Sequence, residues 1–390
     1  MTHIGVLCNL DTSADPRQQL STSVLNRAYL ISQLLEPEGI RLFLYSPKDV
    51  TPDGEAPGFV LHEGLPVAGH RSVPRVNANW TYATRRLLRA GMGYQPFKRW
   101  MRERGLEAYV PYEFSELVSN KLRTYEAVRA WDESLHPHTE EFTTSPAQIE
   151  SFLERSKLVF IKPRAGHKGN RIFVLRNGGA RLALEYYDSR GRRSFPCITL
   201  DAVLTLVDTV TRKERYVVQV GIESLRHAGA VFDVRVVMIH DGRGWHDLFE
   251  TRLAPPGSVL SNVYQGGTIH ATPELLASTV GPRNGRSVEN RLRQIAHGLA
   301  AHFESRYPGA LPEIGFDFVL DPDHVPHLVE VNAKPGIAGI GSERRVFDWT
   351  PDEKPLHEMW TLPHMKHLAD FLRHRVDPGR PVPDFQEARS

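Results

Sequence analysis

The chain has 390 residues, of which 41% are hydrophobic and 24% are charged, as in ordinary globular proteins and unlike disordered or fibrous ones. At roughly 100–200 residues per domain, this length predicts two or three compact units. Lys and Arg number 48 against 46 for Asp and Glu, which gives a formal net charge of +2. This balance argues against nucleic acid as the main partner.

The cysteines, Cys8 and Cys197, lie far apart and exclude both a disulfide scaffold and a cysteine-based zinc site. The apolar run before Asn9, about five residues long, is too short for a signal-peptide core. No segment reaches the ~18 apolar residues that a membrane-spanning helix needs. These features predict a cytoplasmic protein without a membrane partner. The 18 histidines show no repeating spacing, so most are expected to be surface or core residues.

The N-terminal part of the chain alternates strand-like and helix-like patterns. A strand is expected at 4–8, a helix around 25–35, and further strands at 41–45 and 59–62. Strands that alternate with helices predict a parallel α/β layer. Basic helices are expected at 81–88 and 97–104, and another helix at 121–131. The chain changes character near residue 112, so the first domain is predicted to span 1–112.

The middle and C-terminal parts have patterns typical of antiparallel strands. Asp241-Gly242 is a favoured signal for a tight turn between two strands. A helix is expected at 287–307, and the Pro- and Arg-rich tail from Asp377 is expected to be loose. Strands are expected at 158–162, 172–175, 216–220, 234–239, 316–320 and 327–331.

The last strand pair carries the most informative side chains. If Leu320 faces His327 and the register is continuous, Asp317 lies directly opposite Glu330. Asn332 shares their face, because side chains alternate along a strand. The opposite face then carries Phe316, Phe318, Val329 and Val331. One face is therefore predicted to be apolar, while the other gathers two carboxylates and an amide.

Two carboxylates directly opposite each other destabilise a sheet unless another group compensates their charge. A divalent cation would do so, and the all-oxygen ligand set of Asp317, Glu330 and Asn332 favours Mg²⁺ or Mn²⁺ held partly by substrate phosphates. The alternative is structural: one carboxylate pairs with an arginine or faces solvent, and the register is shifted by one residue. The sequence leaves both interpretations open.

Cationic side chains suited to phosphate lie on neighbouring predicted strands. Lys162 ends an apolar strand, where its stem can lie along the core and its ammonium can reach a phosphate. Asp233 and Arg235 share one face of their strand. Arg252 begins a segment that ends with Ser261-Asn262 and Gly266-Gly267, which offers a guanidinium fork and close approach of the backbone. Each residue alone is more often solvated or ion-paired, so the signal lies in their order along the chain.

This ordered set resembles the ATP-grasp superfamily and, within it, the YheC/YheD family of endospore coat-associated proteins, with the RimK-type ligases as more distant relatives. The similarity runs from Gly93 to Leu372, and the match in the N-terminal layer is weaker. The matching stretches are Gly93-Tyr-Gln-Pro-Phe97, Asn120-Lys121, Leu135-His-Pro-His-Thr139, Phe160-Ile-Lys162-Pro163, Gln219-Val-Gly221-Ile222, Phe232-Asp233-Val-Arg235, Arg252-Leu-Ala, Ser261-Asn262 with Gly266-Gly267, Gly315-Phe-Asp317 and Glu330-Val-Asn332-Ala-Lys334-Pro335-Gly336.

The resemblance implies an N-terminal α/β (pre-ATP-grasp) domain followed by a two-subdomain ATP-grasp fold, with the nucleotide between the subdomains. The first subdomain, with a phosphate-covering flap, is expected at 113–219. The second, catalytic and metal-binding subdomain is expected at 220–376, followed by a loose tail at 377–390.

The resemblance also implies roles for individual residues. Lys121 and Lys162 would hold the α- and β-phosphates, and Asp233 would lie at the nucleotide site. The transferring γ-phosphate would meet Arg235 and Arg252, and Asn262 would be a third catalytic residue. The metal ions would bind to Asp317, Glu330 and Asn332. Adenine would lie against Gln219, Val220, Gly221 and Ile222.

The expected flap departs from the family pattern. Residues 166–171 contain only two glycines, so fewer backbone N–H groups can approach phosphate than in relatives. His167 and Lys168 could compensate with their charge. The same departure also fits a flap that has lost catalytic efficiency.

The implied activity is that of an ADP-forming ligase, in which ATP converts a carboxylate to an acyl phosphate and an amine then displaces phosphate. One alternative is a non-catalytic or weakly active nucleotide-binding protein of a spore coat or assembly, and a second is an ATP-dependent phosphotransferase. The expected partners are ATP, Mg²⁺ or Mn²⁺, and small-molecule or peptide carboxylates and amines. Substrate identity and homo-oligomerisation stay open, and a spore-coat location is expected only if the source organism sporulates.

Overall fold

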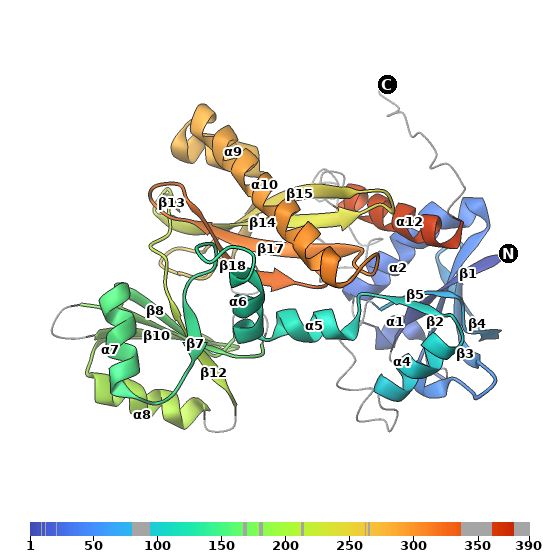
Figure 1. Cartoon of the computed structure of the whole chain (residues 1–390), viewed down its shortest axis with the longest axis horizontal. Helices are drawn as coiled ribbons and strands as arrows, with labels where there is room; N and C mark the ends of the chain where they lie inside the picture. The colour runs from blue at the N-terminus through green and yellow to red at the C-terminus, as the bar shows by residue number, and fades with distance from the viewer. Residues whose placement is uncertain are drawn as a thin grey trace.

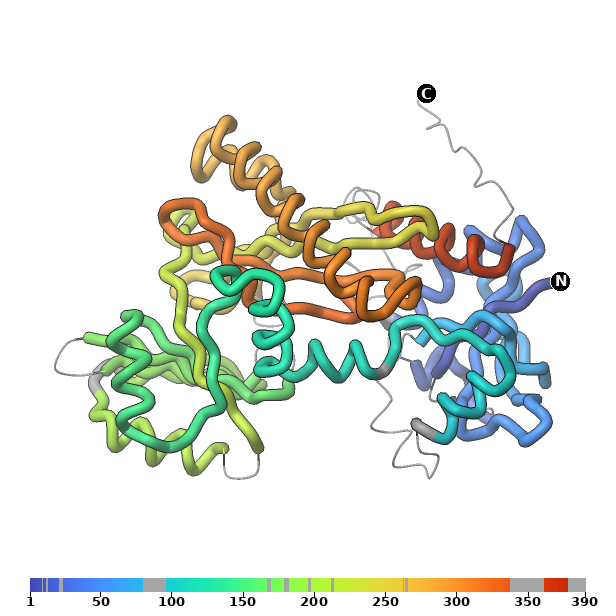
Figure 2. The backbone as a smooth tube through the Cα atoms, in the orientation of Figure 1, coloured from blue at the N-terminus to red at the C-terminus, as the bar shows by residue number. Residues whose placement is uncertain are grey.

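The computed structural model describes residues 1–8, 10–11, 13–20, 22–79, 94–166, 170–178, 182–211, 214–261, 263, 266–336 and 361–377. Strands in these residues form three β-sheets that follow one another along the long axis of the molecule (Figure 1). The N-terminal layer lies at one end, the second sheet at the other end, and the third sheet between them. The last described helix returns to the N-terminal layer, as the backbone trace also shows (Figure 2).

The first sheet forms the N-terminal layer. Its strands are β1 (Thr2–Leu7), β2 (Ile40–Tyr45), β3 (Glu55–His62), β4 (Leu65–Ser72), β5 (Val76–Ala78) and β6 (Glu107–Tyr109), in the order β4-β3-β2-β1-β5-β6. The pairs β1–β2, β1–β5 and β5–β6 are parallel, whereas β2–β3 and β3–β4 are antiparallel. The expectation of a wholly parallel layer is therefore wrong for β3. Residues 46–54 are too short a connection for the crossover that parallel pairing requires.

Helices flank this sheet and lead out of it. They are α1 (Pro16–Gln19), α2 (Thr22–Leu35), the 3₁₀ turns η1 (Glu36–Glu38) and η2 (Pro47–Asp49), α4 (Tyr94–Glu103), α5 (Tyr112–Ser119) and α6 (Lys121–Arg129). The helices expected at 25–35, 97–104 and 121–131 are confirmed, and the one expected at 81–88 lies outside the described residues. Asn120 caps α6, because its side chain accepts a hydrogen bond from the backbone N–H of Arg123.

The second sheet is antiparallel throughout its described pairs. Its strands are β7 (Thr139–Glu141), β8 (Leu158–Pro163), β9 (Ile172–Asn177), β10 (Leu182–Asp188), β11 (Gly191–Ile198) and β12 (Tyr216–Val220), in the order β11-β10-β9-β8-β12-β7. Helices α7 (Pro146–Arg155) and α8 (Leu200–Thr211) close its core with Phe152 and Val207. The predicted strands at 158–162 and 172–175 are confirmed and pair with each other, while residues 167–169 of the predicted turn between them lie outside the described residues.

The third sheet has the strand order β16-β15-β14-β17-β18, and β13 pairs with β14 beside this path. Its elements are β13 (Arg226–His227), β14 (Ala230–His240), β15 (Trp245–Leu253), β16 (Thr268–His270), α9 (Thr272–Val280), α10 (Pro282–Arg306), β17 (Glu313–Leu320), β18 (Pro326–Asn332) and α12 (Leu362–Val376). The predicted turn at Asp241-Gly242 joins β14 to β15, and Gly242 takes the left-handed φ of 99° that suits glycine.

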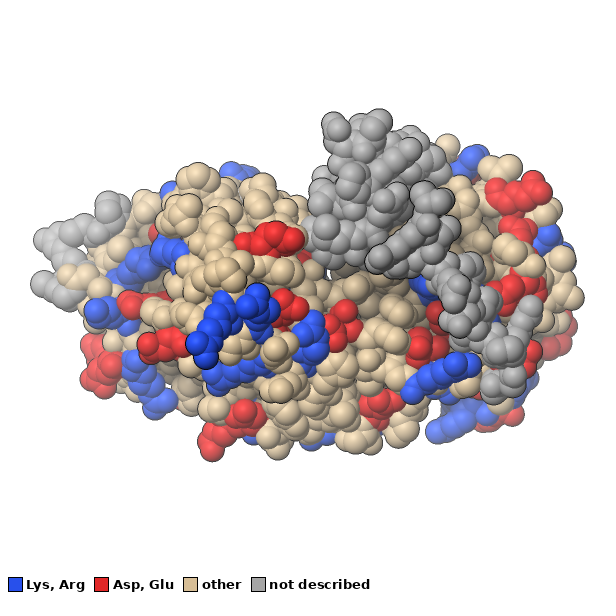
Figure 3. Space-filling view, turned by 90° about the horizontal axis from the view of Figure 1, so that it is seen from above, with Lys and Arg blue, Asp and Glu red and all other residues tan. Residues whose placement is uncertain are grey.

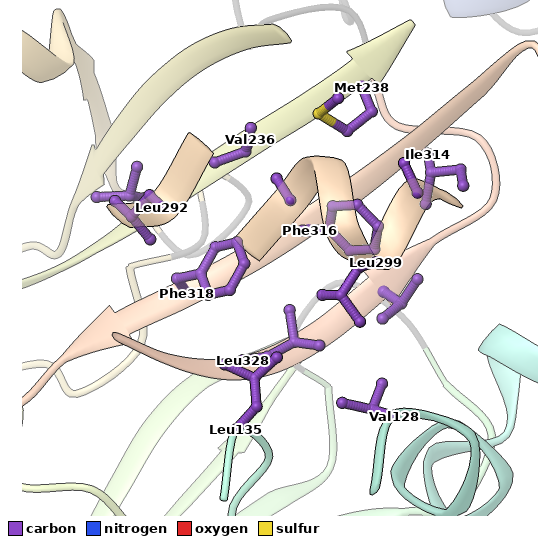
Figure 4. Packing of buried hydrophobic residues seen from close by; sticks show 14 of the residues in the cluster. Val128, Leu135, Val236, Met238, Leu292, Leu299, Ile314, Phe316, Phe318 and Leu328 are labelled. Carbon is purple, nitrogen blue, oxygen red and sulfur yellow. The ribbon is translucent and has the colours of Figure 1, made fainter. Parts of the chain in front are cut away.

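The two faces of β14 meet different surroundings. Val236 and Met238 point into the core under α10, where Phe316 and Phe318 of β17 join them (Figure 4). On the other face, the apolar residues near the end of β14 pack in a second core with α12 and the N-terminal layer. The start of β14 on that same face carries Asp233 and Arg235, because side chains alternate. This face is therefore apolar under α12 and polar where the site lies.

The surface mixes both signs of charge. On the face seen in Figure 3, Lys and Arg side chains are interspersed with Asp and Glu. Within the described ranges, no helix combines the length and the apolar character needed to cross a membrane.

Candidate functional site

Four charged side chains cross the polar half of the third sheet in a line, which we call the charged row: Glu250, Arg235, Asp317 and Glu330. Cross-strand pairing places Glu250 of β15 opposite Arg235 of β14, Arg235 opposite Asp317 of β17, and Asp317 opposite Glu330 of β18. Charges of opposite sign alternate over the first three strands. Two carboxylates meet at the last pair.

Asp317 is the centre of this row and is only 1% exposed. Arg235 donates from Nε to Oδ1 at 2.7 Å and from Nη2 to Oδ2 at 2.8 Å, a bidentate pair. Arg252 Nη2 lies 2.9 Å from Oδ2, and Asn332 Nδ2 donates to the same oxygen at 3.3 Å. Burial alone would raise the pKa of Asp317, but the two guanidiniums outweigh it and hold that pKa well below its usual value.

Arg252 joins the charged row to a second buried carboxylate, Asp233. It donates from Nε to Asp233 Oδ1 at 2.6 Å and from Nη2 to Oδ2 at 2.8 Å. The hydroxyl of Ser261 also donates to Oδ2 of Asp233. Burial raises the pKa of Asp233. Both predicted arginines are thus present on one face, each held there by a buried carboxylate.

Glu250 belongs to this network and was missed by the sequence reasoning. It is 5% exposed, its Oε1 lies 3.9 Å from Arg235 Nη1, and burial raises its pKa. The usable signal was the alternation Glu250-Thr251-Arg252, which puts Glu250 on the same face as Arg252.

The predicted facing of Asp317 and Glu330 is confirmed, but the predicted continuous register is wrong. Near the turn, Leu320 pairs with Pro326 and not with His327. A β-bulge between Asp317 and Phe318 leaves one extra residue in β18, because Phe318 pairs with Leu328 while Asp317 pairs with Glu330. The bulge also changes which side chains face the core, so Leu328 is fully buried in place of Val329.

Lys162 and Gln219 lie together on the second sheet. Lys162 Nζ donates to Gln219 Oε1 at 2.6 Å and lies 4.7 Å from the centre of the Phe160 ring. Gln219 is buried, and its amide donates to Thr139 Oγ1 at 2.9 Å. Burial and then the nearby Lys121 lower the pKa of Lys162 to about 8, against an opposing effect of Glu330. Glu330 is thus near enough to Lys162 for its charge to affect the lysine.

Lys121 begins α6 next to the end of β8. Its Nζ donates to the carbonyl of Gly166 at 3.0 Å, and its backbone N–H donates to the carbonyl of Arg164 at 2.9 Å. Lys121 therefore lies at the entrance to the expected flap. Three predicted site residues, His167 and Lys168 of that flap and Asn262, lie outside the described residues.

Residues 220–222 connect the second sheet to the third. Val220 N–H donates to the carbonyl of His138 at 3.0 Å, and Gly221 N–H donates to that of Leu158 at 2.7 Å. A Cβ on Gly221 would lie 2.5 Å from Leu158 Cγ and 2.7 Å from its carbonyl oxygen, so the chain passes where only glycine fits. Ile222 follows in the same connection and is partly buried.

The predicted metal ligands lie together, but with different partners. Arginines surround both oxygens of Asp317, whereas Glu330 makes no side-chain hydrogen bond or ion pair to any described residue. The charge of Asp317 is thus compensated by arginine, as the structural alternative anticipated. The oxygen set of Asp317, Glu330 and Asn332 still fits a hard divalent cation, provided that an arginine gives up one oxygen of Asp317.

A second buried polar cluster joins the third sheet to the N-terminal layer, and no sequence pattern predicted it. Glu313, at the start of β17, is fully buried and pairs with Arg27 of α2 and with His364 of α12, the latter at 2.7 Å. Lys334 Nζ lies 3.4 Å from Asn79 Oδ1, and burial lowers the pKa of Lys334 to about 7. These contacts tie α2, α12 and Asn79 to the third sheet.

Comparison with known proteins agrees with this architecture. A family model described as YheC/D-like ATP-grasp matches residues 112–346. The chain is 24% identical over 205 residues to the endospore coat-associated protein YheD of Bacillus subtilis (strain 168); the match covers 50% of this chain and only 43% of that relative.

Solved structures resemble almost the whole chain. D-cycloserine synthetase DcsG superposes with a TM-score of 0.55 at 12% identity, over 96% of this chain and 99% of that one. The D-alanine-D-alanine ligase from Coxiella burnetii gives a TM-score of 0.53 at 13% identity, over 97% and 96%. The ATP-grasp ligase PsnB gives 0.50 at 14% identity, over 96% and 99%. These likenesses confirm the expected fold class.

Proposed function

The chain belongs to the YheC/D-like ATP-grasp family, and we propose that it is an ATP-dependent, ADP-forming ligase that joins a carboxylate to an amine. In this proposal ATP lies between the second and third sheets, with adenine against residues 219–222. The observation that carries the proposal is the pair of arginines, Arg235 and Arg252, which the buried carboxylates of Asp317 and Asp233 hold on one face of the third sheet.

Phosphoryl transfer to a carboxylate needs positioning and charge neutralisation more than a covalent participant. The γ-phosphate oxygens accept the guanidinium N–H groups of Arg235 and Arg252, and Lys121 and Lys162 meet the preceding phosphates. Where phosphate takes the N–H groups that now bond to Asp317, which are those on Nε and Nη2 of Arg235 and on Nη2 of Arg252, oxygens of Asp317 are released. Those oxygens, with Glu330 and Asn332, are then available to hold Mg²⁺ or Mn²⁺, which when bound supplies further neutralisation of phosphate charge.

The chemistry balances without a protein nucleophile. A carboxylate oxygen of the substrate attacks the γ-phosphorus, the bond from that phosphorus to the β–γ bridging oxygen breaks, and ADP leaves. The amine nitrogen then attacks the acyl carbon, phosphate leaves, and the nitrogen loses its proton to solvent. The products are an amide, ADP and phosphate. The substrates are small-molecule or peptide carboxylates and amines in this proposal.

A second candidate is a nucleotide-binding protein without turnover. The observation that favours it is the saturation of Asp317 by two arginines, an arrangement that also serves a purely structural ion-pair network. The relative YheD is described as endospore coat-associated, and a coat role for this chain belongs to this candidate.

The test is calorimetric titration of the full chain with ATP, with and without Mg²⁺, followed by assays of ADP, phosphate and amide product against pools of carboxylates and amines. Metal-dependent binding and amine-stimulated release of ADP and phosphate support the ligase. ADP with a phosphorylated product and no free phosphate supports a phosphotransferase. Binding without release supports the nucleotide-binding candidate, and no binding contradicts all of these proposals.

Two matched variants assign the metal role. Glu330→Gln should abolish turnover, because it removes one of the two carboxylates proposed as ligands. Asp323→Asn is the control, since Asp323 is an exposed carboxylate in the turn of the same β17–β18 hairpin. Unchanged turnover in Glu330→Gln, or an equal loss in both variants, contradicts the metal assignment.

A further inference from the structure

The turn of the β14–β15 hairpin and helix α12 bring together three side chains that the proposed ligase chemistry does not use. Asp241 lies in the turn, His246 lies on β15 and His367 on α12, and one ligand atom of each lies within 4.8 Å of the others. His246 Nε2 lies 2.8 Å from Asp241 Oδ2. The rings of His246 and His367 stack with their centres 4.0 Å apart. One carboxylate and two imidazoles form a typical ligand set for transition metals.

The turn holds Asp241 in place. Its Oδ1 accepts hydrogen bonds from the backbone N–H groups of Arg243 at 2.7 Å and Gly244 at 2.9 Å, which leaves Oδ2 directed at His246. The turn also lies close to α12, because a Cβ on Gly242 would be 2.7 Å from His374 Cβ. Metal ligands are commonly oriented by such outer hydrogen bonds.

His367 supplies an independent observation. Its Nδ1 atom is buried and has no hydrogen-bond partner in the part of the chain that the structure describes. Buried polar atoms normally have a partner, because burial removes them from water. The ring that carries this nitrogen stacks on a second imidazole beside an anchored carboxylate, so the side chain is suited to a metal ion.

We propose that Asp241, His246 and His367 bind a divalent transition-metal ion of the Zn²⁺ class, which ties α12 to the β14–β15 hairpin. Ligand atoms around tetrahedral Zn²⁺ lie about 3.3 Å apart, given bonds of about 2.0–2.2 Å. Binding therefore draws the three atoms closer and turns the two rings out of their stack. The χ2 torsion of histidine is broad and permits this rotation.

This site differs chemically from the proposed ATP-linked metal site. The charged row offers oxygen atoms only, which suit Mg²⁺, whereas two imidazole nitrogens favour Zn²⁺ or Co²⁺. Because α12 packs in the core that it shares with the N-terminal layer, an ion at this site connects the third sheet to that core. Its effect is therefore expected on stability, separately from turnover.

The test uses untagged full-length protein, stripped of metal and free of nucleotide, with Zn²⁺ alone as ligand and a chelating dye as competitor. Wild-type protein should bind one Zn²⁺ per chain. The variants His246→Ala and His367→Ala should bind no Zn²⁺ or should bind it at least about tenfold more weakly than the wild type. Co²⁺ should give the visible absorption of a tetrahedral nitrogen–oxygen site in the wild type only. Zn²⁺ should raise the melting temperature of the wild type and not of these variants.

His297→Ala is the matched control. His297 Nε2 lies 2.9 Å from Asp247 Oδ2, a similar surface His–Asp pair on α10 and β15 that belongs to no ligand group among the described residues. This variant should behave as wild type. If an alanine variant does not fold, Asp241→Asn keeps an oxygen for the turn and gives the same comparison. The proposal is overturned if the wild type binds Zn²⁺ no more tightly than a folded variant of Asp241, His246 or His367. It is also overturned if His297→Ala loses as much Zn²⁺ affinity as those variants do.

Discussion

Asp317→Asn and Glu330→Gln remove one negative charge each from two directly opposed positions, yet they should differ sharply in their effect on stability. Asp317 is buried and accepts hydrogen bonds from two guanidiniums. Removing one partner of a buried ion pair costs about 3–5 kcal/mol, because the remaining charge stays buried without compensation. Glu330 is only partly buried and has no such pair among the described residues, so its change should stay within about 1 kcal/mol.

The measurement is amide hydrogen exchange of peptides that cover β17, without nucleotide or metal. A local readout is needed because a chain of this size does not unfold in one step. Asp317→Asn should lower the opening free energy of β17 by about 3–5 kcal/mol. Equal effects of the two variants, or a loss below about 1 kcal/mol for Asp317→Asn, would refute the view that Asp317 holds the arginines.

Three further predictions concern the proposed nucleotide site. Phosphate favours protonated Lys162, whose pKa is about 8. The affinity for ATP should therefore be constant below pH 8 and fall about tenfold per pH unit above it, which calorimetry across this pH range would measure. Lys162→Arg should remove this pH dependence. Gly221→Ala should lower stability by about 1–3 kcal/mol, because its Cβ would meet the Leu158 carbonyl at 2.7 Å; an unchanged melting temperature argues against this close packing. Arg235→Lys keeps the charge but loses the bidentate fork, so steady-state kinetics should show kcat falling more than ATP affinity; equal losses would make Arg235 a ground-state contact.

The β17–β18 hairpin shows how far alternation predicts a site. It correctly assigned Asp317 and Glu330 to facing positions, because period-two patterning fixes which face a side chain takes. It could not reveal the bulge at Val329, since an extra residue in one strand leaves no clear mark in the pattern. The correct pairing at Asp317 therefore coexists with a wrong pairing at Leu320.

Contacts between elements distant in sequence were beyond local patterns. Arg27 and Glu313 are separated by 286 positions, and nothing near either residue indicates the other. His367 was among histidines expected to be ordinary, because its partners lie on a different element. The sequence allowed the interpretation that an arginine neutralises the charge of one carboxylate of the pair. Only the strand order β15-β14-β17 shows which arginines reach Asp317.

The core shared by the two ends of the chain has a consequence for the order of folding. Ile4 of β1, Ile239 of β14 and Leu372 of α12 all lie in it, so it cannot close before α12 has left the ribosome. At roughly 5–20 residues per second, the first strand waits on the order of 20–70 s for that helix. Among the described residues, the core of the second sheet draws on residues 142–220 and can form earlier. The N-terminal layer is thus made before the other two sheets but is among the last to become native, and its exposed apolar strands are where a nascent chain is open to chaperones.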